Sequence, residues 1–371
     1  MADYKSAVQR MLSLAEIEIN GNRPWDVQIH HPGFYKRVIT EGELGLGESY
    51  MDGWWTCDAL DQLFYKILSK DIRKQIKVPF TEAASLLLTR LLNMQTRTRS
   101  KKVVDTHYNP SSEVILSFLD PYNQYSCGYF KETDDLNEAQ EQKLDLICKK
   151  LALTATDRVL DIGCGWGGFA KFAAERYACH VTGISISDEQ LTYAKDDCEG
   201  LPVQLVCSDY RDFMGSFSKV VSIGMIEHAG HKNYRTLMEV VHTCLEDDGL
   251  FLLHTIGSLI SGTRIDPWTA KYIFANSNLP SLQQLARASE GLFVLEDLHN
   301  FGQYYDPTVM AWADNFERNW PQFEAQYDER VYRMWTYYLR HLAGAFRSRK
   351  NQLWQLVFSK KGVPGGYDAI R

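Results

Sequence analysis

The stretch that most constrains the fold runs from Val159 to Phe169 and reads VLDIGCGWGGF. A short apolar segment leads into a turn dense in glycine, and apolar side chains at helical spacing follow. Glycine is needed where a chain turns sharply and where backbone must lie against a ligand with no Cβ between them. The pattern therefore predicts the first strand, loop and helix of a doubly wound α/β sheet, with a nucleotide-like ligand at the carboxyl ends of its strands.

Polar side chains after three predicted strands narrow the choice of ligand. The glycine spacing does not match the G-x-G-x-x-G of a dinucleotide fold, and the second strand lacks the lone acidic residue that usually meets a ribose there. The side chains concerned are Asp161 at the first strand, Ser185 and Gln190 after the second (179–184), and Asp209 and Tyr210 after the third (203–207). They favour S-adenosylmethionine over a nicotinamide or a flavin. Glycines that serve only a tight turn are the remaining alternative.

The chain alternates predicted strands and helices from residue 157 to about 257, as a parallel α/β sheet requires. We expect a Rossmann-like methyltransferase domain over residues 105–371 and a small, mainly helical amino-terminal domain over residues 1–80. The other expected strands are 27–29, 217–223, 249–255 and 354–359, with helices over 4–20, 32–40, 60–68 and much of the region from 280 onward. Glycines between residues 42 and 55 indicate loops around an aromatic cluster.

Composition excludes several classes of protein. A net charge of −7 disfavours a nucleic-acid-binding surface, which would be basic. The eight cysteines are scattered without a C-x-x-C pair, which is typical of a reduced, cytoplasmic chain rather than a disulfide framework or a zinc ribbon. No apolar run approaches the ~18 residues of a membrane span, so any membrane contact is expected to be peripheral.

Residues 81–104 form a strongly apolar segment that runs into a cationic cluster: Arg97, Arg99, Lys101 and Lys102. An apolar stripe beside positive charge suits the surface of an anionic bilayer. The segment therefore predicts an amphipathic, basic linker helix that docks on a membrane. The alternative is a helix whose apolar face packs on the protein and whose charges are solvated.

Several further motifs together carry a family resemblance. They are GLGESYMDGWW (45–55), QYSCGYF (124–130), LDIGCGWGG (160–168), SIGMIEH (222–228), HTIG (254–257), YIF (272–274) and GAFR (344–347). With them the chain resembles the cyclopropane-fatty-acyl-phospholipid synthases over nearly its whole length. Over its catalytic part it is similar to the mycolic-acid cyclopropane synthases.

The resemblance implies methylene transfer from S-adenosylmethionine to a cis double bond of a phospholipid acyl chain. It also implies a bound bicarbonate as base, a homodimer, and a cytoplasmic enzyme held peripherally at the inner face of the membrane. The cofactor residues that it implies are Tyr125 and Ser126 near the methionine portion, Asp161, Gly163, Cys164, Gly165 and Gly167 at the turn, Ser185 and Gln190 near the ribose, and Asp209 and Tyr210 near the adenine.

The resemblance also places bicarbonate among Cys127, Glu227, His254, Ile256 and Tyr305. Backbone N–H groups near Cys127 and Ile256 can donate to an anion, as can the side chains of Tyr305 and His254. Glu227 can accept the hydroxyl proton of bicarbonate and fix its orientation. Taken singly, each residue also fits a structural role, such as a buried hydrophobe, a helix cap or a core histidine.

The expected chemistry gives the aromatic surplus of the carboxyl half a function. Attack of an alkene on a sulfonium methyl leaves a carbocation on the acyl chain, which aromatic faces can stabilise and from which water must be kept. Core packing is the alternative for any one ring. Some relatives carry a cysteine where this chain has Leu342, so a thiol there is not required. The His-x-x-His spacing of 228–231 lacks helical H-E-x-x-H order, and we expect no metal.

Overall fold

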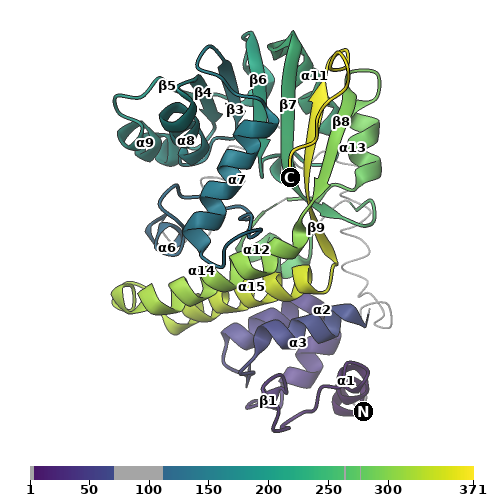
Figure 1. Ribbon diagram of the computed structural model, residues 1–371. Helices are drawn as coiled ribbons and strands as arrows, with labels where there is room; N and C mark the ends of the chain where they lie inside the picture. Colours follow the sequence, from purple (N-terminus) through teal and green to yellow (C-terminus); the bar gives the residue numbers. More distant parts are fainter. Residues whose placement is uncertain (1–3, 71–111, 263–264, 276) are drawn as a thin grey trace.

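The computed structural model describes residues 4–70, 112–262, 265–275 and 277–371 of the 371-residue chain. Figure 1 shows three layers: a twisted sheet with helices on both faces, a pair of long helices beneath it, and the amino-terminal helices beneath that pair. The predicted linker helix over 81–104 and the predicted domain boundary near residue 80 lie outside the described residues. Among the helices that the structure describes, none is long and apolar enough to cross a bilayer.

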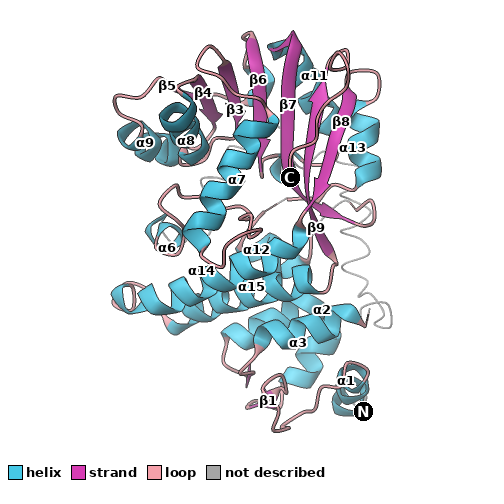
Figure 2. Cartoon of the chain, in the orientation of Figure 1, coloured by secondary structure: helices cyan, strands magenta, loops and turns pink. Residues whose placement is uncertain are grey.

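The central sheet has seven strands in the order β5-β4-β3-β6-β7-β9-β8 (Figure 2). The first five are mutually parallel, and β9 and β8 each pair antiparallel with their neighbours. Their bounds are β3 Arg158–Ile162, β4 His180–Ser185, β5 Val203–Cys207, β6 Phe217–Ile223, β7 Leu245–Ser258, β8 Val294–Asn300 and β9 Asn351–Ser359. The strand order reverses on either side of β3, and that switch point is where such sheets bind nucleotide-like ligands. The predicted fold class is confirmed.

Helices cover both faces of the sheet, and a helical pair closes its carboxyl edge. Polar caps start several of them: Asp135 accepts from two backbone N–H groups of α7, and Ser281 forms a capping box with Gln284. The bounds are α6 Ser112–Leu116, α7 Leu136–Lys150, α8 Gly168–Tyr177, α9 Asp188–Asp197, α10 Ile226–Ala229, α11 Tyr234–Cys244, α12 Pro267–Tyr272, α13 Leu282–Ser289, α14 Tyr305–Asn319 and α15 Glu329–Arg347. Short 3₁₀ turns occupy Tyr210–Asp212, Gly302–Tyr304 and Trp320–Gln322.

The amino-terminal part is mainly helical, as predicted. It comprises α1 Tyr4–Ser13, β1 Gln28–Ile29, α2 Phe34–Met51, β2 Trp55–Thr56 and α3 Leu60–Ser69. The predicted loop over 42–55 is wrong for most of its length, because α2 bends at Gly42 (φ 62°) and continues to Met51. A Cβ on Gly47 would lie 2.3 Å from the ring of Trp268. These glycines therefore permit close helix packing rather than a loop.

Strand β8 was missed by the sequence analysis, which predicted helices in this region. It lies at the edge of the sheet, so Val294 and Leu295 are exposed and the usual apolar run is lost. A register shift between Leu295 and Asp297 breaks the alternation further. The polar side chain of Asp297 is instead paired with Arg371. An edge strand of this kind carries little periodic signal.

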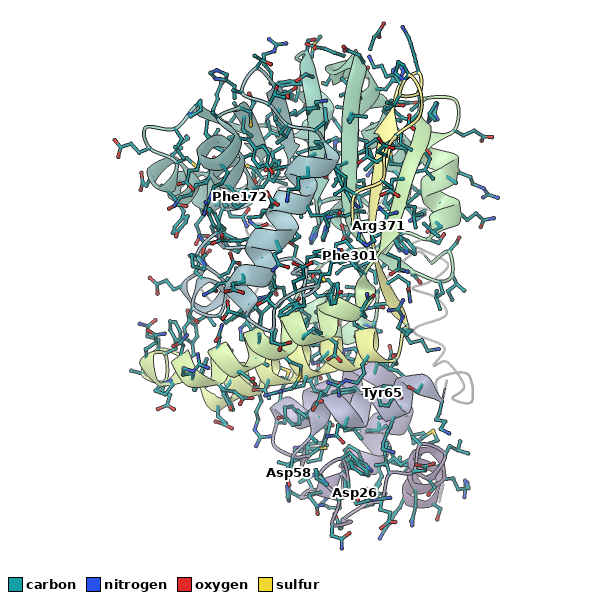
Figure 3. All side chains as sticks on the ribbon, in the orientation of Figure 1. Asp26, Asp58, Tyr65, Phe172, Phe301 and Arg371 are labelled. Atoms are coloured by element: carbon teal, nitrogen blue, oxygen red, sulfur yellow. The ribbon has the colours of Figure 1, made fainter. Side chains whose placement is uncertain are left out.

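Helices α14 and α15 join the two parts of the molecule through one continuous hydrophobic core. Phe64 of α3 packs edge-on against Tyr337 of α15, with ring centroids 5.1 Å apart. Figure 3 places Tyr65 on the α15 side of the amino-terminal helices and Phe301 between the sheet and the long helices. The Arg347 guanidinium of α15 binds Asp61 of α3 at 2.6 Å. The amino-terminal helices are thus packed on the catalytic part by aromatic contacts and by charge.

Gly344 tests this packing. A Cβ there would lie 2.7 Å from Phe64 Cβ and 2.9 Å from the Asp61 carbonyl oxygen. In a free helix Gly→Ala stabilises by up to about 1 kcal/mol, so the Gly344→Ala variant should instead lose about 1–3 kcal/mol through overpacking. Thermal or denaturant unfolding measures the change. Glu329→Ala on the same helix is the exposed control and should shift stability by less than about 0.5 kcal/mol. A stabilised Gly344→Ala would show that α3 and α15 do not meet this closely.

Candidate active site

A cavity of about 1350 Å³ lies between the carboxyl edge of the sheet and helices α14 and α15. Residues of α2 and α3 also line it. Of the predicted site residues, all but Cys127 and Gly167 line it. Those that do are Tyr125, Ser126, Asp161, Gly163, Cys164, Gly165, Ser185, Gln190, Asp209, Tyr210, Glu227, His254, Ile256 and Tyr305. The sequence analysis treated the cofactor residues and the anion residues as two groups, and the structure brings both into one continuous space.

The glycine turn after β3 has the backbone that only glycine adopts easily. Gly163, Gly165 and Gly167 have φ values of 83°, 54° and 81°. Gly163 and Gly165 face the cavity, so a ligand can approach their backbone closely. Gly167 does not line the cavity: a Cβ there would lie 2.9 Å from Ala194 Cβ of α9. Its function in this structure is helix packing at the start of α8.

The ends of the next two strands present ordered polar groups to the cavity. Ser185 Oγ accepts from the Ser187 N–H at 3.2 Å, and Ser187 in turn caps α9 by accepting from the Gln190 N–H. Asp209 accepts from the backbone N–H and the Nε of Arg211 at 3.0 and 2.8 Å. These hydrogen bonds hold the strand-end segments in place before a ligand arrives, so less ordering remains to be done on binding.

A buried lysine that the sequence analysis missed supports the loop at residues 124–126. Lys143 of α7 is fully buried, and its Nζ donates to Gln124 Oε1 at 2.5 Å and to Ser126 Oγ at 2.9 Å. Burial lowers the pKa of Lys143 to about 7, against the pull of nearby carboxylates such as Asp120 and Asp161. The sequence signal for its burial is spacing. Lys143 lies seven residues after Leu136 and four residues before Ile147, so it shares the buried face of the helix with them.

Asp161 is a second buried ionisable residue here, and it interacts with the charge of Lys143. It is 2% exposed, and burial raises the pKa of its carboxyl to about 7, with Lys143 acting in the opposite direction. A carboxylate at this position favours a cationic group beside it, because a positive charge restores the ionised form. The turn therefore suits the amino or sulfonium charge of a ligand better than a phosphate.

Glu227 and His254 lie deeper in the cavity and present polar atoms that have no hydrogen-bond partner among the described residues: Glu227 Oε2 and His254 Nε2. Burial raises the pKa of Glu227 to about 7 and lowers that of His254 well below its ordinary value. His254 Nδ1 lies 3.3 Å from the Gln355 amide nitrogen, an assignment that puts the imidazole proton on Nε2. His254 Nε2 is thus a neutral donor and Glu227 Oε2 a carboxylate acceptor. Both atoms are buried, and both are available to a small ligand.

Two residues predicted for the anion pocket are placed differently from the expectation. The Ile256 N–H, expected to donate to an anion, donates to Glu227 Oε1 at 2.7 Å and so fixes that carboxylate. Cys127 is fully buried outside the cavity lining, where its Sγ donates to the Gly128 carbonyl at 3.2 Å. Burial also raises the pKa of its thiol, as expected for a packed, unreactive cysteine.

Aromatic rings form the wall beyond these polar groups. Tyr125 and Trp312 have ring centroids 5.2 Å apart, and Tyr305 meets Trp312 edge-on at 6.0 Å. Phe274 and Tyr338 extend the wall, with centroids 6.0 Å apart. All five line the cavity. Such a wall excludes water and offers π faces to a positive charge on a ligand.

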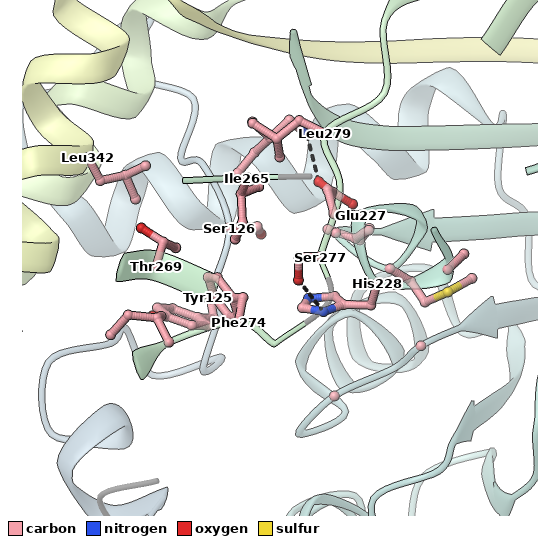
Figure 4. Close-up of a pocket in the computed structure, with 18 of the residues that line it drawn as sticks. Tyr125, Ser126, Glu227, His228, Ile265, Thr269, Phe274, Ser277, Leu279 and Leu342 are labelled. Carbon is pink, nitrogen blue, oxygen red and sulfur yellow. Dashed lines mark hydrogen bonds between the residues drawn. The ribbon is translucent and has the colours of Figure 1, made fainter. Parts of the chain in front are cut away.

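Figure 4 shows part of the lining around Glu227. Nδ1 of His228 and Oγ of Ser277 share a hydrogen bond of 3.2 Å, so the imidazole ring is held in place by the protein. Leu342 of α15 faces the same space with an apolar side chain. Across the described ranges no group of three or more His, Cys, Asp or Glu side chains is arranged to hold a metal ion.

Comparison with known proteins agrees with this geometry. The sequence family described as mycolic acid cyclopropane synthetase matches residues 95–356. The chain is 49% identical to the cyclopropane-fatty-acyl-phospholipid synthase of Escherichia coli (strain K12), over 97% of this chain and 94% of that protein. It is 32% identical to cyclopropane mycolic acid synthase 1 of Mycobacterium tuberculosis, over 66% of this chain and 92% of that one.

Among solved structures, the mycolic acid cyclopropane synthase CmaA1 complexed with SAH and CTAB superposes with a TM-score of 0.65 at 30% identity. The match covers 70% of this chain and 98% of that structure. Cyclopropane synthase MmaA2 from Mycobacterium tuberculosis gives 0.66 at 28% identity, covering 72% and 100%. The fold and the glycine turn define an S-adenosylmethionine-dependent methyltransferase of class I. Within that class, the chain belongs to the cyclopropane synthase family.

Lys143 offers a test of how the cofactor loop is held. In the Lys143→Met variant Gln124 Oε1 and Ser126 Oγ lose a buried donor, worth about 1 kcal/mol, so affinity for S-adenosylhomocysteine should fall at least about fivefold. Isothermal titration calorimetry measures it. Lys149→Met is the matched control, because that lysine is exposed on the same helix and pairs with Asp145. Unchanged affinity in a folded Lys143→Met protein would separate this loop from cofactor binding.

Proposed function

We propose that this protein transfers a methylene group from S-adenosylmethionine to the cis double bond of an unsaturated phospholipid acyl chain, with bound bicarbonate as base. The observation that carries the proposal is the single cavity that joins the glycine turn, the unsatisfied pair of Glu227 and His254, and an aromatic wall. A relative that is 49% identical over nearly the full length and bears the name of this activity supports the choice of lipid.

The net reaction forms two carbon–carbon bonds and removes one proton. An alkene carbon bonds to the transferred methyl as the carbon–sulfur bond breaks, the cation left on the acyl chain loses a methyl proton, and the ring closes. S-adenosylmethionine supplies the electrophilic methyl and bicarbonate supplies the base. Asp161 sits where a carboxylate can balance the positive charge of the donor. The backbone of Gly163 and Gly165 allows close approach, because no Cβ intervenes.

The residues around Glu227 fit a small anion with one hydroxyl proton. Glu227 Oε2 can accept that proton, and the Ile256 N–H holds the other oxygen of the carboxylate. His254 Nε2 can donate to an anion, because burial keeps the ring neutral and Nδ1 is already engaged. Preorganised groups of this kind stabilise charge without reorganising during the reaction. The proposed contact from the backbone near Cys127 rests on the family resemblance alone.

The aromatic wall has two proposed tasks. Trp312, Tyr125 and Phe274 exclude water, which would otherwise trap the cation as an alcohol. Their π faces also lower the energy of the positive charge that forms on the acyl chain. The π-cation effect is worth about 1–2 kcal/mol per well-placed ring once water is removed.

We also propose a peripheral association with the cytoplasmic face of the membrane and a homodimeric assembly. The phospholipid substrate supports the first, because an acyl chain must be taken from a bilayer. A dimer would present two docking surfaces at once and so bind a bilayer by avidity. Analytical ultracentrifugation and vesicle sedimentation test these two proposals separately.

The first experiment is turnover of purified protein with S-adenosylmethionine and unsaturated phospholipid vesicles, with and without bicarbonate. We expect acyl chains that gain one CH₂ and lose their olefinic protons, faster with bicarbonate, by mass spectrometry and proton NMR. A methyl-branched or hydroxylated chain would mean that the cation is quenched by hydride shift or by water. Cofactor binding without any product would indicate a silent lipid-binding protein.

Glu227→Gln tests the acceptor. The amide cannot take a proton, so kcat should fall at least about 100-fold, within the range of a lost general base, while affinity for S-adenosylhomocysteine stays unchanged. The acidic limb of the wild-type kcat profile should lie near pH 7, the pKa that burial gives this carboxyl. Near-wild-type turnover of the variant would remove Glu227 from the reaction.

The same variant should be more stable than the wild type at alkaline pH. The folded pKa of Glu227, about 7, lies above its ordinary value of 4.5, so the folded state binds more protons and loses stability as pH rises between those values. The stability difference should therefore grow from pH 4 to pH 8, towards about 3 kcal/mol. Denaturant unfolding at several pH values measures it. A constant difference would show that Glu227 ionises as it does in water.

A further inference from the structure

Two large apolar side chains stand in solvent at the end of strand β7. Leu259 is 67% exposed and Ile260 is 76% exposed, directly after Ser258, the last residue of the strand. Neighbouring apolar side chains that are exposed together are unusual on a protein surface that contacts only water. Their position is more informative than their exposure, because both residues also line the active-site cavity.

The two residues form one rim of the cavity mouth. Apolar side chains of the amino-terminal helices also line the cavity: Val38, Leu46, Ile67 and Leu68. The same cavity therefore includes the glycine turn, Glu227, the aromatic wall, these apolar side chains and the exposed pair. A path of this kind suits a hydrocarbon chain that has one end in the cavity and the other outside.

The loop that carries this pair is anchored at both ends. The Ile260 N–H donates to Ser258 Oγ at 3.4 Å, and Ser261 Oγ lies 2.7 Å from Ser281 Oγ at the start of α13. The Gln284 side chain donates to the Gly262 carbonyl at 3.2 Å. Hydrogen bonds thus hold residues 258–262 against the protein, while Leu259 and Ile260 project from them into solvent.

A positive charge stands beside the apolar pair. Lys350 directly precedes Asn351, the β9 residue that pairs with Ser258 at the end of this ladder, and Leu259 directly follows Ser258. Lys350 also lines the cavity. Apolar tips flanked by a cation match the interface of a phospholipid bilayer, where phosphates overlie acyl chains.

We propose that Leu259 and Ile260 insert into the phospholipid bilayer and place the cavity mouth against the acyl-chain region. This inference rests on the proposed function for the identity of the lipid, and it assigns that function a docking surface distinct from residues 81–104. Insertion would bring the opening to the depth of the acyl chains, so that a chain passes from lipid to cavity along apolar surface. Water then has no access while the mouth is on the membrane.

The test compares Leu259→Asp/Ile260→Asp with wild-type protein on two forms of one lipid, dioleoyl phosphatidylglycerol. The lipid is supplied either as vesicles or dispersed in nonionic detergent micelles. Charged side chains cannot enter hydrocarbon cheaply, so the ratio of vesicle to micelle turnover should fall at least about tenfold. Met214→Asp is the matched control. Met214 is 84% exposed, but it precedes β6 and so lies at the amino ends of the strands, opposite the cavity. Its substitution should leave the ratio unchanged.

A second measurement reports insertion directly and needs no turnover. Of the eight cysteines, all within the described part of the chain, only Cys207 is exposed, so a Cys207→Ser background allows a single new thiol to be labelled. A polarity-sensitive fluorophore on Ile260→Cys should shift to the blue when vesicles are added. The same label on Met214→Cys should not.

Each outcome decides the proposal. An unchanged vesicle-to-micelle ratio together with no spectral shift overturns it. A shift that grows with protein concentration in the absence of lipid would show that a second copy of the chain covers the pair, and would also overturn it. If no phospholipid is turned over in either form, the proposed function fails, while the label on Ile260→Cys still reports whether this loop enters the bilayer.

Discussion

The packing of α14 and α15 between the sheet and the amino-terminal helices is the contact on which the active site depends. These two helices supply Tyr305, Trp312 and Tyr338 to the cavity wall, and α15 also packs on α2 and α3. A minimal methyltransferase sheet leaves its carboxyl edge open to solvent. Here the helical pair α14–α15 covers that edge. The amino-terminal helices hold the pair in place through Phe64 and through the Asp61–Arg347 ion pair.

By covering the cavity, α14 and α15 also influence the pKa values of the buried side chains that line it. Without water, buried carboxyls hold their protons more tightly and buried amines hold theirs less tightly. Asp161, Glu227 and Lys143 follow this rule, each with a pKa near 7. Their charge states therefore depend on which ligand lies beside them. A cationic donor next to Asp161 favours the carboxylate, so the binding of the ligand helps to create the charge that holds it.

Sequence patterns predicted the cofactor half of the molecule better than the lipid half. Strands 203–207 and 217–223 were predicted with the bounds that the structure has, because each is a short run rich in β-branched and other apolar residues with clear ends. The glycine turn was recognised by its density of glycine. Strand β8 and the extension of α2 past Gly42 were not predicted, since the polar residues and register shift of β8 and the glycines used for packing in α2 give misleading local signals.

The same division applies to the site residues. Residues at strand ends could be predicted from position alone, since parallel strands bring their carboxyl ends to one edge. Lys143 could not, because its role depends on α7 lying against the loop at 124–126, a contact between segments separated by 17 residues. Gly167 was grouped with the cofactor glycines by the family resemblance. The structure assigns it to the packing of α8 on α9, which no local pattern distinguishes.

The position of Glu227 explains how one cavity can serve both a charged reaction and an apolar substrate. Its carboxylate accepts from the Ile256 N–H, and the few hydrogen bonds it receives only partly offset the cost of burying its charge, so its pKa rises to about 7. An ion-pair partner would lower that pKa and leave a weaker base. An acyl chain that fills the aromatic wall would remove further water and raise the pKa again. In the proposed reaction, burial by the substrate would therefore strengthen the acceptor at the moment when a proton must leave.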